Sequence, residues 1–444
     1  MGSSPWDASL VWSEPADLDP AAVVARLATA FAAAPPDPAT LHAGLLRLAD
    51  ILVQRRAEAV DLLVREAGKT TADAAAEADL LPRKIAITLD QGLALTPLTP
   101  PATVQGVVWR ARGVAVILGP FNFPLHLLHG LVAPALAVGC PVVAKPSERT
   151  PACGAFYASC LAEAGLDAWC AVVQGGADTA RALIAAPGTA TVAAVGSRGM
   201  GEALSRQLAG RPELVLALEL GGVNHALLCA DADFARAVPA LADGAWRLAG
   251  QRCTATRVVH VPATRCAELM ERLAAERQRW LPDGTPAGPM GPLIDASAAE
   301  RFAAAWATAP ATWQVWGAPR ERRLQPASSA FCPPFLALAD DGAHTLLRDE
   351  HFGPGLVVLP YTDEARAIHL MRANPHRLAA AVWTADRDRF LALAARLPYG
   401  LVVHNRNTAG ARSDLPFGGT GHSGNGRPAA LTAGQIFADQ CVVG

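Results

Sequence analysis

The hydrophobic pattern of the first ninety residues is typical of helices. Between Asp19 and about Gln91, apolar residues recur every three or four positions, which places them on one face of a helix. Asp37-Pro38 has the composition of a helix start, and Gly68 that of a helix end. The prolines between residues 95 and 101 fix φ and remove backbone donors, so we expect a connector there. Residues 103–112 then alternate in the manner of an exposed strand.

From residue 114 onward, short apolar runs alternate with helical segments. The expected strands are 114–118, 141–144, 171–173, 189–195 and 214–218, and the helices between them are 125–138, 152–164, 177–186 and 200–209. Such alternation predicts parallel strands with right-handed crossovers, an architecture that binds nucleotides at the ends of its strands. Similar units run from Asp233 to about Pro398. The predicted fold class is α/β, with two doubly wound domains, which also suits a chain of 444 residues.

Composition and charge narrow the classes of partner. The net charge of -2 and the isoelectric point near 6.6 offer no electrostatic basis for binding nucleic acid or a membrane surface. The longest apolar run, about 131–144, is broken by prolines and is too short to span a bilayer, and residues 1–20 lack the apolar segment of a secretory signal. Nine cysteines without a CxxC pair argue against a disulfide framework and a zinc cluster. We therefore expect a cytoplasmic protein that acts on small molecules and holds no metal.

One cysteine stands apart from the other eight, which we expect to fill hydrophobic cores. Cys253 follows a small, polar turn and precedes an apolar run that reads as a strand, so its thiol is expected at the mouth of the fold. Glu219 ends a predicted strand, and the two glycines after it would let the chain turn sharply. Asn122 lies in the run Gly-Pro-Phe-Asn-Phe-Pro at 119–124. Each residue alone is more often structural, but together they supply a nucleophile, a base and an oxyanion donor.

Two further stretches of the sequence have residues that could bind a nucleotide. Residues 196–201, Gly-Ser-Arg-Gly-Met-Gly, lie between a predicted strand and helix, where backbone amides favour a phosphate. Arg198 occupies the place of the second glycine of G-x-G-x-x-G, so a plain tight turn explains this stretch equally well. Lys145-Pro146-Ser147-Glu148 ends another predicted strand and could offer an amine and a carboxylate to ribose hydroxyls, although a solvated loop is the commoner case. His126 and His129 lie on an apolar helix and are expected to be packed or capping groups.

Together these motifs resemble the aldehyde dehydrogenase superfamily, over about residues 20–440. The seven motifs, in the family's order, are Gly119–Pro124, Lys145–Glu148, Gly196–Gly201, Glu219–Gly222, Gly250–Cys253, Glu350–Pro354 and Pro416–Gly419. Within the superfamily, residues 83–87, 123–127, 250–254 and 423–428 are similar to the N-succinylglutamate 5-semialdehyde dehydrogenases of arginine catabolism.

The resemblance implies a role for each catalytic candidate. Cys253 would attack the aldehyde carbon as a thiolate, and the Asn122 side chain with the Cys253 backbone N–H would hold the oxyanion. Hydride transfer to the nicotinamide would leave a thioester, and Glu219 would activate the water that hydrolyses it. A substrate that carries carboxylates needs cationic partners, for which Arg252, Arg406 and Arg412 are the candidates.

The resemblance also implies an NAD site. Its expected residues are Lys145, Ser147, Glu148, Gly196, Ser197, Gly201, Glu350 and Phe352. Among them, Lys145 and Glu148 would hold the adenosine ribose, Gly196 and Ser197 the pyrophosphate, and Glu350 with Phe352 the nicotinamide-side ribose. A carboxylate at Glu148 would repel a 2'-phosphate, so NAD is expected rather than NADP.

The expected domain boundaries follow from the same resemblance. Residues 1–97, 114–219 and 400–436 would form the NAD-binding domain, and residues 220–399 the catalytic domain. Residues 98–113 and 437–444 would form a bridging segment, which supports oligomerisation in the family. This segment is expected to be truncated, without the family's N-terminal hairpin and C-terminal tail, which leaves a homodimer as an open expectation.

Three alternatives stay open. The chain could be an aldehyde dehydrogenase of another specificity, which motifs alone do not distinguish. It could be a non-catalytic homologue that binds nucleotide, although a scaffold has no use for Cys253, Glu219 and Asn122 together. It could also transfer the acyl group to coenzyme A, although a hydrolytic base at Glu219 would compete with a thiol acceptor.

Overall fold

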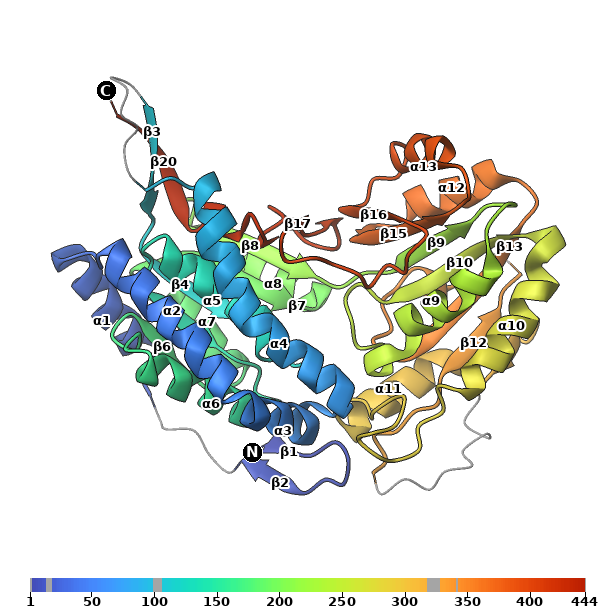
Figure 1. The fold of residues 1–444 in the computed structure, drawn as a ribbon, viewed down its shortest axis with the longest axis horizontal. Coiled ribbons are helices and arrows are strands. Elements are labelled where there is room, and N and C mark those ends of the chain that lie inside the picture. The colour runs from blue at the N-terminus through green and yellow to red at the C-terminus, as the bar shows by residue number, and fades with distance from the viewer. Residues whose placement is uncertain (1, 13–17, 99–105, 318–327, 341, 444) are drawn as a thin grey trace.

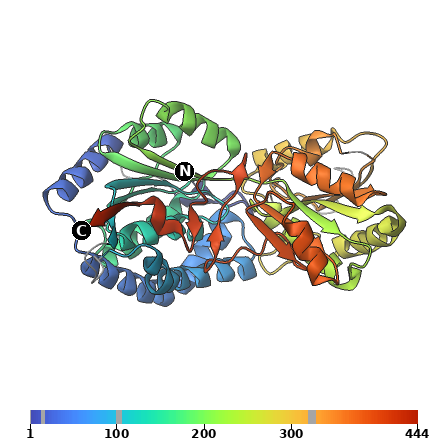
Figure 2. The same ribbon diagram turned by 90° about the horizontal axis from the view of Figure 1, so that it is seen from above.

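Two α/β lobes lie side by side, and a two-stranded arm projects from the first of them (Figures 1 and 2). The computed structural model describes residues 2–12, 18–98, 106–317, 328–340 and 342–443. Residues 99–105 lie outside the described residues, and they include the first three residues of the predicted strand 103–112.

The first lobe is built on a five-stranded parallel sheet with the order β6-β5-β4-β7-β8. Its strands are β4 (Val114–Leu118), β5 (Val142–Lys145), β6 (Cys170–Val172), β7 (Thr189–Gly196) and β8 (Val215–Leu220). Its helices are α1 (Pro20–Ala33), α2 (Pro38–Gln54), α3 (Arg56–Ala67), α4 (Thr71–Ile87), α5 (His126–Ala137), α6 (Pro151–Glu163), α7 (Ala177–Ala185) and α8 (Arg198–Leu208). The parallel doubly wound architecture that the alternation predicted is confirmed.

The central strand β4 shows why this sheet is covered on both faces. Successive side chains of a strand point to opposite faces. Ala115 and Ile117 enter the core formed with α2 to α6, whereas Val114, Val116 and Leu118 enter the core formed with α1, α7 and α8. All five residues are buried, which explains a continuous apolar run rather than an alternating one.

Buried carboxylates cap two helices of the first lobe. Glu77 on α4 accepts hydrogen bonds from the backbone N–H groups of Leu125 and His126 at the start of α5, at 3.1 and 2.9 Å. Glu66 on α3 accepts in the same way from Ala152 and Cys153 at the start of α6. A carboxylate at a helix N-terminus accepts hydrogen bonds from backbone N–H groups that have no partner within the helix. Its negative charge also interacts favourably with the positive end of the helix dipole. These contacts lock the helical layer onto α5, which carries one wall of the site described below.

The second lobe is built on a seven-stranded sheet with the order β11-β12-β13-β10-β9-β15-β16, parallel except for β11. The strands are β9 (Asn224–Leu228), β10 (Thr256–Pro262), β11 (Gln314–Trp316), β12 (Phe335–Leu338), β13 (Gly355–Tyr361), β15 (Ala379–Trp383) and β16 (Leu401–His404). Helices α9 (Phe234–Trp246), α10 (Cys266–Gln278) and α11 (Ala296–Trp306) pack in the core on one face, and α12 (Glu364–Ala373) and α13 (Arg387–Ala394) pack in the core on the other.

Strand β16 corrects part of the predicted domain division. Residues from 400 onward were expected to return to the first domain, but β16 pairs with β15 from Ala379 to Val382 and forms the edge of the second sheet. A four-residue apolar run does not specify which sheet edge it completes, because edge pairing is a long-range contact. The other boundaries stay a prediction.

The remaining strands are short pairs, apart from the arm. The arm consists of β3 (Gly106–Ala111) and β20 (Ala438–Val443), paired antiparallel along their whole length. The short pairs are β14 (His376–Arg377) with β18 (Thr420–Gly421), β17 (Pro416–Phe417) with β19 (Ala429–Ala430), and β1 (Gly2–Ser3) with β2 (Leu10–Trp12). The last pair is an N-terminal hairpin, which the sequence analysis did not expect; two strands of two and three residues are too short to show an alternating pattern.

The cysteines and the predicted helix ends agree with the sequence analysis at all but one position. Cys253 aside, seven of the other eight cysteines are buried, whereas Cys441 is half-buried on the arm; all nine are free thiols. The Asp37 carboxylate caps α2, and Gly68 ends α3 with φ of 68°. The core-filling prediction fails for Cys441 because a two-stranded arm has no core in which to bury it.

Candidate active site

Two cavities meet at Cys253. The first, of about 440 Å³, is lined by one face of α4 together with residues of α5 and of the 407–417 segment, and we call it the α4 cavity. The second, of about 580 Å³, is lined by the start of α8, the loop 119–122 and residues 350–352, and we call it the α8 cavity. Cys253 and Glu219 line both cavities. The thiol and the carboxylate therefore lie where two different molecules could meet.

The backbone before Cys253 is held in an unusual conformation. Leu248, Ala249 and Gly250 have φ of 57°, 50° and 66°, the left-handed region that costs L residues about 1–2 kcal/mol each. The buried guanidinium of Arg257 donates to the carbonyls of Gly250 and Gly353 at 2.6 and 2.5 Å and so holds this turn. Strained backbone that neighbouring groups hold in place is typical of functional sites.

The Cys253 thiol is half-buried and sits in a negative environment. Burial raises the pKa of Cys253 well above its ordinary value of 9.0, and the nearby carboxylates of Glu219 and Glu350 raise it further. Beyond the thiol, the Asn224 side chain donates to the Cys253 carbonyl at 2.8 Å and holds the residue at the start of the second sheet. In this arrangement the thiol keeps its proton until a base removes it.

Asn122 is fixed next to the thiol by a contact between the lobes. Its Nδ2 donates to the carbonyl of Gln251 at 2.8 Å, and the Gln251 side chain in turn accepts from Ile294 N–H at 2.9 Å. A side-chain amide has two N–H donors, so one stays available. Asn122 is buried and lines the α8 cavity together with Cys253. The predicted oxyanion donor and nucleophile are thus brought to the same cavity.

Glu219 is a buried carboxylate with little compensation. It is 1% exposed, and neither oxygen meets the geometry of a hydrogen bond to any residue that the structure describes. Burial raises the pKa of Glu219 well above 4.5, against the weaker opposite effects of the Gly419 backbone and the Arg427 guanidinium. A raised pKa makes this carboxylate a stronger base than an ordinary one, which suits a general base.

The two glycines after Glu219 have a different purpose from the predicted one. Neither Gly221 nor Gly222 has a positive φ, so the chain does not need them for a sharp turn. A Cβ on Gly221 would lie 1.8 Å from the Glu350 carboxylate, and one on Gly222 would lie 2.8 Å from the Cys253 carbonyl. Close approach, rather than backbone freedom, requires glycine here.

Most residues of the predicted nucleotide site line the α8 cavity, and two do not. The residues that line it are Ser147, Glu148, Gly196, Ser197, Glu350 and Phe352. Lys145 is buried outside the lining, where its ammonium donates to the Pro146 carbonyl and lies 3.7 Å from the Glu148 carboxylate. Gly201 is buried inside α8, where a Cβ would collide with Leu220. Gly201 thus serves helix-to-strand packing in this structure.

The cavity offers a helix N-terminus and two carboxylates. Ser197 caps α8 by accepting from Met200 N–H at 3.2 Å, and both residues line the cavity. Glu148 is exposed, whereas Glu350 is half-buried and accepts from Gly222 N–H at 2.9 Å. Burial raises the pKa of Glu350 to about 7, against the effect of the Arg257 guanidinium. Phe352 meets Phe121 edge-on, with ring centroids 5.9 Å apart.

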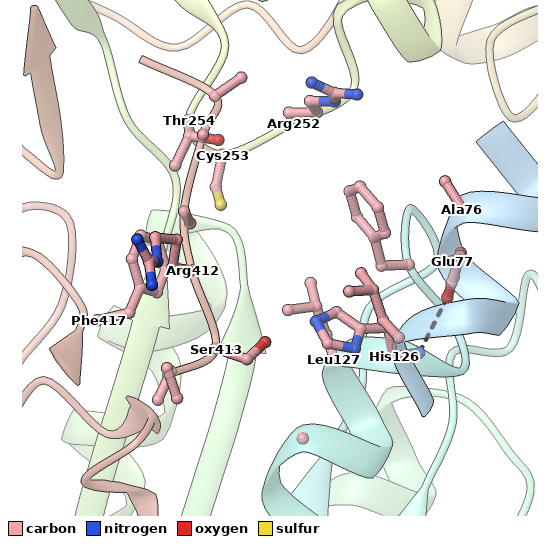
Figure 3. A pocket seen from close by; sticks show the side chains of 18 of the residues that line it. Ala76, Glu77, His126, Leu127, Arg252, Cys253, Thr254, Arg412, Ser413 and Phe417 are labelled. Carbon is pink, nitrogen blue, oxygen red and sulfur yellow. Dashed lines mark hydrogen bonds between the residues drawn. The ribbon is translucent and has the colours of Figure 1, made fainter. Parts of the chain in front are cut away.

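The three predicted substrate arginines separate in the structure. Arg252 and Arg412 line the α4 cavity on either side of Cys253 (Figure 3). Arg252 is half-buried and its Nε has no hydrogen-bond partner among the described residues, whereas Arg412 is exposed and paired with Asp414 at 2.5 Å. Arg406 is exposed and lines neither the α4 nor the α8 cavity.

Sequence reasoning missed the contribution of α4, which it interpreted only as part of a helical lead-in. Residues at successive turns of this helix line the α4 cavity: Asp73, Ala76, Glu77, Leu80 and Lys84. Their spacing of three, four, seven and eleven places them on one helix face. Charged residues that recur at the spacing of a single helix face were the sequence signal that could have identified these lining residues. His129, by contrast, is a packed residue as predicted, with its ring nitrogens bonded to Tyr157 Oη and the Leu81 carbonyl.

None of the helices among the described residues is long and apolar enough to cross a membrane. The same residues contain no group of three or more His, Cys, Asp or Glu side chains that could hold a metal ion.

Comparisons with known proteins identify the family. Residues 8–439 match the model of the aldehyde dehydrogenase family. The chain is 38% identical over 405 residues to N-succinylglutamate 5-semialdehyde dehydrogenase 1 of Caulobacter vibrioides, which covers 88% of this chain and 84% of that protein. It is 34% identical to the enzyme of the same name from Escherichia coli K12, over 90% of this chain and 82% of that one.

Solved structures agree as well. The NAD-dependent aldehyde dehydrogenase of Sinorhizobium meliloti superposes with a TM-score of 0.92 and 26% identity, over 100% of this chain and 90% of that one. The glyceraldehyde-3-phosphate dehydrogenase of Methanocaldococcus jannaschii, in complex with NADP, shares the fold with a TM-score of 0.90 at 22% identity, over 99% and 97% of the two chains. The chain therefore belongs to the aldehyde dehydrogenase family.

Proposed function

We propose that this protein oxidises an aldehyde to a carboxylate through a thioester on Cys253, with NAD as the electron acceptor. The observation that carries the proposal is the junction of the two cavities at Cys253, with Asn122 and Glu219 beside it. We further propose N-succinyl-L-glutamate 5-semialdehyde as the substrate, because the relatives at 34–38% identity bear that name.

The α8 cavity fits a dinucleotide. Its volume of about 580 Å³ lies in the range of small-molecule sites. The first turn of α8 offers backbone N–H groups to a pyrophosphate, and the carboxylates of Glu148 and Glu350 offer acceptors for the two riboses. When bound, the nicotinamide would supply the hydride acceptor. The negative charge at Glu148 would repel a 2'-phosphate, which is why we propose NAD rather than NADP.

The residues of the chain would perform the remaining steps. The Cys253 thiol would lose its proton to solvent water and attack the aldehyde carbon as a thiolate, and the free N–H of Asn122 would hold the oxygen that becomes negative. Glu219 would take the proton of the water that attacks the thioester, and its raised pKa makes it a stronger base than an ordinary carboxylate. Neither oxygen of Glu219 is held by a hydrogen bond among the described residues, so both can accept from that water.

The arm suggests how two copies could associate. Val107 on β3 and Val442 on β20 are 43% and 78% exposed, which is unusual for apolar residues on a strand pair. We propose a homodimer through the arm. We also propose the predicted division into NAD-binding, catalytic and bridging parts, with β16 assigned to the catalytic part. Light scattering on the purified protein would test it, and a monomer at micromolar concentration would contradict it.

The experiment that tests the function measures NAD reduction by absorbance. The aldehydes are N-succinylglutamate semialdehyde, succinate semialdehyde and a simple aliphatic aldehyde, and Cys253→Ala is the control. Turnover that favours the first aldehyde and disappears in the variant would support both the mechanism and the specificity. An enzyme that binds NAD but turns over none of the three would overturn the proposal.

A further inference from the structure

Two of the cations that line the α4 cavity have no ion pair among the described residues. Four cations line it, and two of them are paired: Arg247 with Asp73 at 2.5 Å, and Arg412 with Asp414 at 2.5 Å. The other two, Lys84 and Arg252, have no carboxylate within ion-pair distance among the described residues. Two unmatched positive charges thus face the space beside the thiol.

The carboxylates of the lining form no ion pair with these two cations. Asp73 pairs with Arg247, as does Asp243 at 3.4 Å. Glu77 pairs with Lys69 at 2.7 Å and caps α5, and Glu219 lies beside the thiol. Four cations and four carboxylates line the cavity, so the lining carries no net charge, but Lys84 and Arg252 remain without a direct ion pair among the described residues.

Of the two cations, Lys84 gives the stronger evidence for a bound anion, because it is almost fully buried. It is 2% exposed, and its ammonium makes one hydrogen bond among the described residues, donating to the carbonyl of Ala430 on β19 at 2.7 Å. An ammonium group has three donors, so two lack a partner among the described residues. Burying a cation against one neutral carbonyl is unfavourable for the fold, and a buried charge normally has a counter-charge.

We propose that Lys84 is a specificity-determining residue whose ammonium binds a carboxylate of the aldehyde substrate. The proposal rests on the proposed function and deepens it. Lys84 comes from α4 of the first lobe and Arg252 from the loop before Cys253, so the two unmatched cations approach the cavity from different lobes. The substrate class that fits is a semialdehyde with carboxylates remote from the reacting carbon, one for each cation.

Lys84 lines a different part of the cavity from Glu77. It lies seven residues beyond Glu77, which is two turns or about 10 Å along α4. Both residues line the cavity that Cys253 also lines (Figure 3).

The first test compares Lys84→Met, which keeps length and helix propensity but removes the charge, with wild type. With N-succinylglutamate semialdehyde, the KM should rise about 10- to 100-fold with little change in kcat, since a charge-assisted contact is lost in ground state and transition state alike. The fold increase in KM should be at least ten times larger for N-succinylglutamate semialdehyde than for an aliphatic aldehyde. Lys84→Arg, which restores the charge, should recover part of the affinity.

Arg83→Met is the matched control. Arg83 neighbours Lys84 on α4, carries the same charge and is exposed, and it does not line the α4 cavity. If Arg83→Met raises the KM as much as Lys84→Met does, the effect comes from long-range electrostatics and not from a direct contact, and the proposal is overturned. Equal losses for the charged and the aliphatic aldehyde in Lys84→Met would show a structural role only, and would also overturn it.

A second measurement needs no variant and decides the question if Lys84→Met does not fold. Burial lowers the pKa of Lys84 to about 8. The titratable groups around it are His126 and His129 on α5, whose pKa values burial lowers to about 4 and 3, and Glu77, which is paired. Strand β19 presents only the Ala430 carbonyl.

The quantity to follow is the ratio of kcat/KM for N-succinylglutamate semialdehyde to kcat/KM for the aliphatic aldehyde, in which the titration of Cys253 cancels. The ratio should fall as pH rises through about 8 and the ammonium of Lys84 loses its proton. A ratio that stays constant from pH 7 to 10 would overturn the inference. Absence of turnover with every aldehyde is a different outcome, which sinks the proposed function itself.

Discussion

Replacement of Glu219 by glutamine should separate the two halves of the reaction. Glutamine keeps the shape of the side chain but does not take up a proton from water. The first NADH per active site should form at a rate close to that of wild type, whereas steady-state turnover should fall about 10²- to 10⁴-fold, the usual contribution of a general base. Stopped-flow absorbance would show a burst of one NADH per site followed by a slow phase.

The same change should stabilise the fold, because Glu219 is buried without a partner among the described residues. The folded pKa of Glu219 lies above its unfolded value of 4.5. Its contribution to stability is therefore intact below about pH 4.5 and is lost as pH rises toward the folded pKa. A buried polar group left without a partner costs about 1–3 kcal/mol, and more when it is charged, so Glu219→Gln should gain about 1–3 kcal/mol at pH 8 and little at pH 5.

That gain can be converted into a melting temperature. Unfolding entropy is about 2.1 cal/mol/K per residue, or about 0.9 kcal/mol/K for this chain if both lobes unfold together. Glu219→Gln should then melt about 1–3 °C higher than wild type at pH 8, by differential scanning calorimetry, with the difference shrinking toward pH 5.

Glu213→Gln is the control for both readouts. Glu213 lies just before β8 and is exposed, and the hydrogen bond from the Arg211 side chain lowers its pKa. It should change neither the burst nor the melting temperature appreciably. Two results would refute the reasoning: normal steady-state turnover of Glu219→Gln, or a melting temperature below that of wild type at pH 8.

Three further predictions concern other parts of the site. Asn122→Ala should lower kcat about 10²- to 10³-fold with unchanged NAD affinity, since one oxyanion donor is lost; stopped-flow kinetics and NAD titration would measure both. Glu148→Ala should lower the kcat/KM ratio of NAD to NADP, because the charge that repels a 2'-phosphate is gone. Lys69→Met should cost about 3–5 kcal/mol in urea unfolding, because it leaves Glu77 buried without its counter-charge.

Each of these predictions has an outcome that contradicts it. If Asn122→Ala loses NAD affinity and kcat together, the residue positions the cofactor rather than the oxyanion. An unchanged NAD to NADP ratio in Glu148→Ala would remove Glu148 from cofactor selection. For Lys69→Met, the double variant with Glu77→Gln should recover part of the loss, and no recovery would mean that packing of the lysine stem, not charge, is at stake.

The sequence by itself determined most elements of the first lobe, the α/β character of the second and the residues at the thiol. Short apolar runs and a periodicity near four residues reflect local structure, so β4, α5 and their neighbours could be placed from adjacent positions alone. Cys253, Glu219 and Asn122 lie in compact motifs whose residue types suggest their chemistry. The structure places Cys253 and Glu219 in the lining of both cavities and Asn122 in the lining of the α8 cavity.

Only the tertiary structure decided which charged groups face the cavities and which are neutralised. Lys84 and the Ala430 carbonyl are 346 residues apart in the chain, and no local pattern indicates their contact. Lys145 and Gly201 lie outside the cavity lining and Arg406 lies on the surface for the same reason: burial is set by elements far away in sequence. The raised pKa of Glu219 likewise arises from desolvation by the folded chain, a property that does not exist before the lobes close around it.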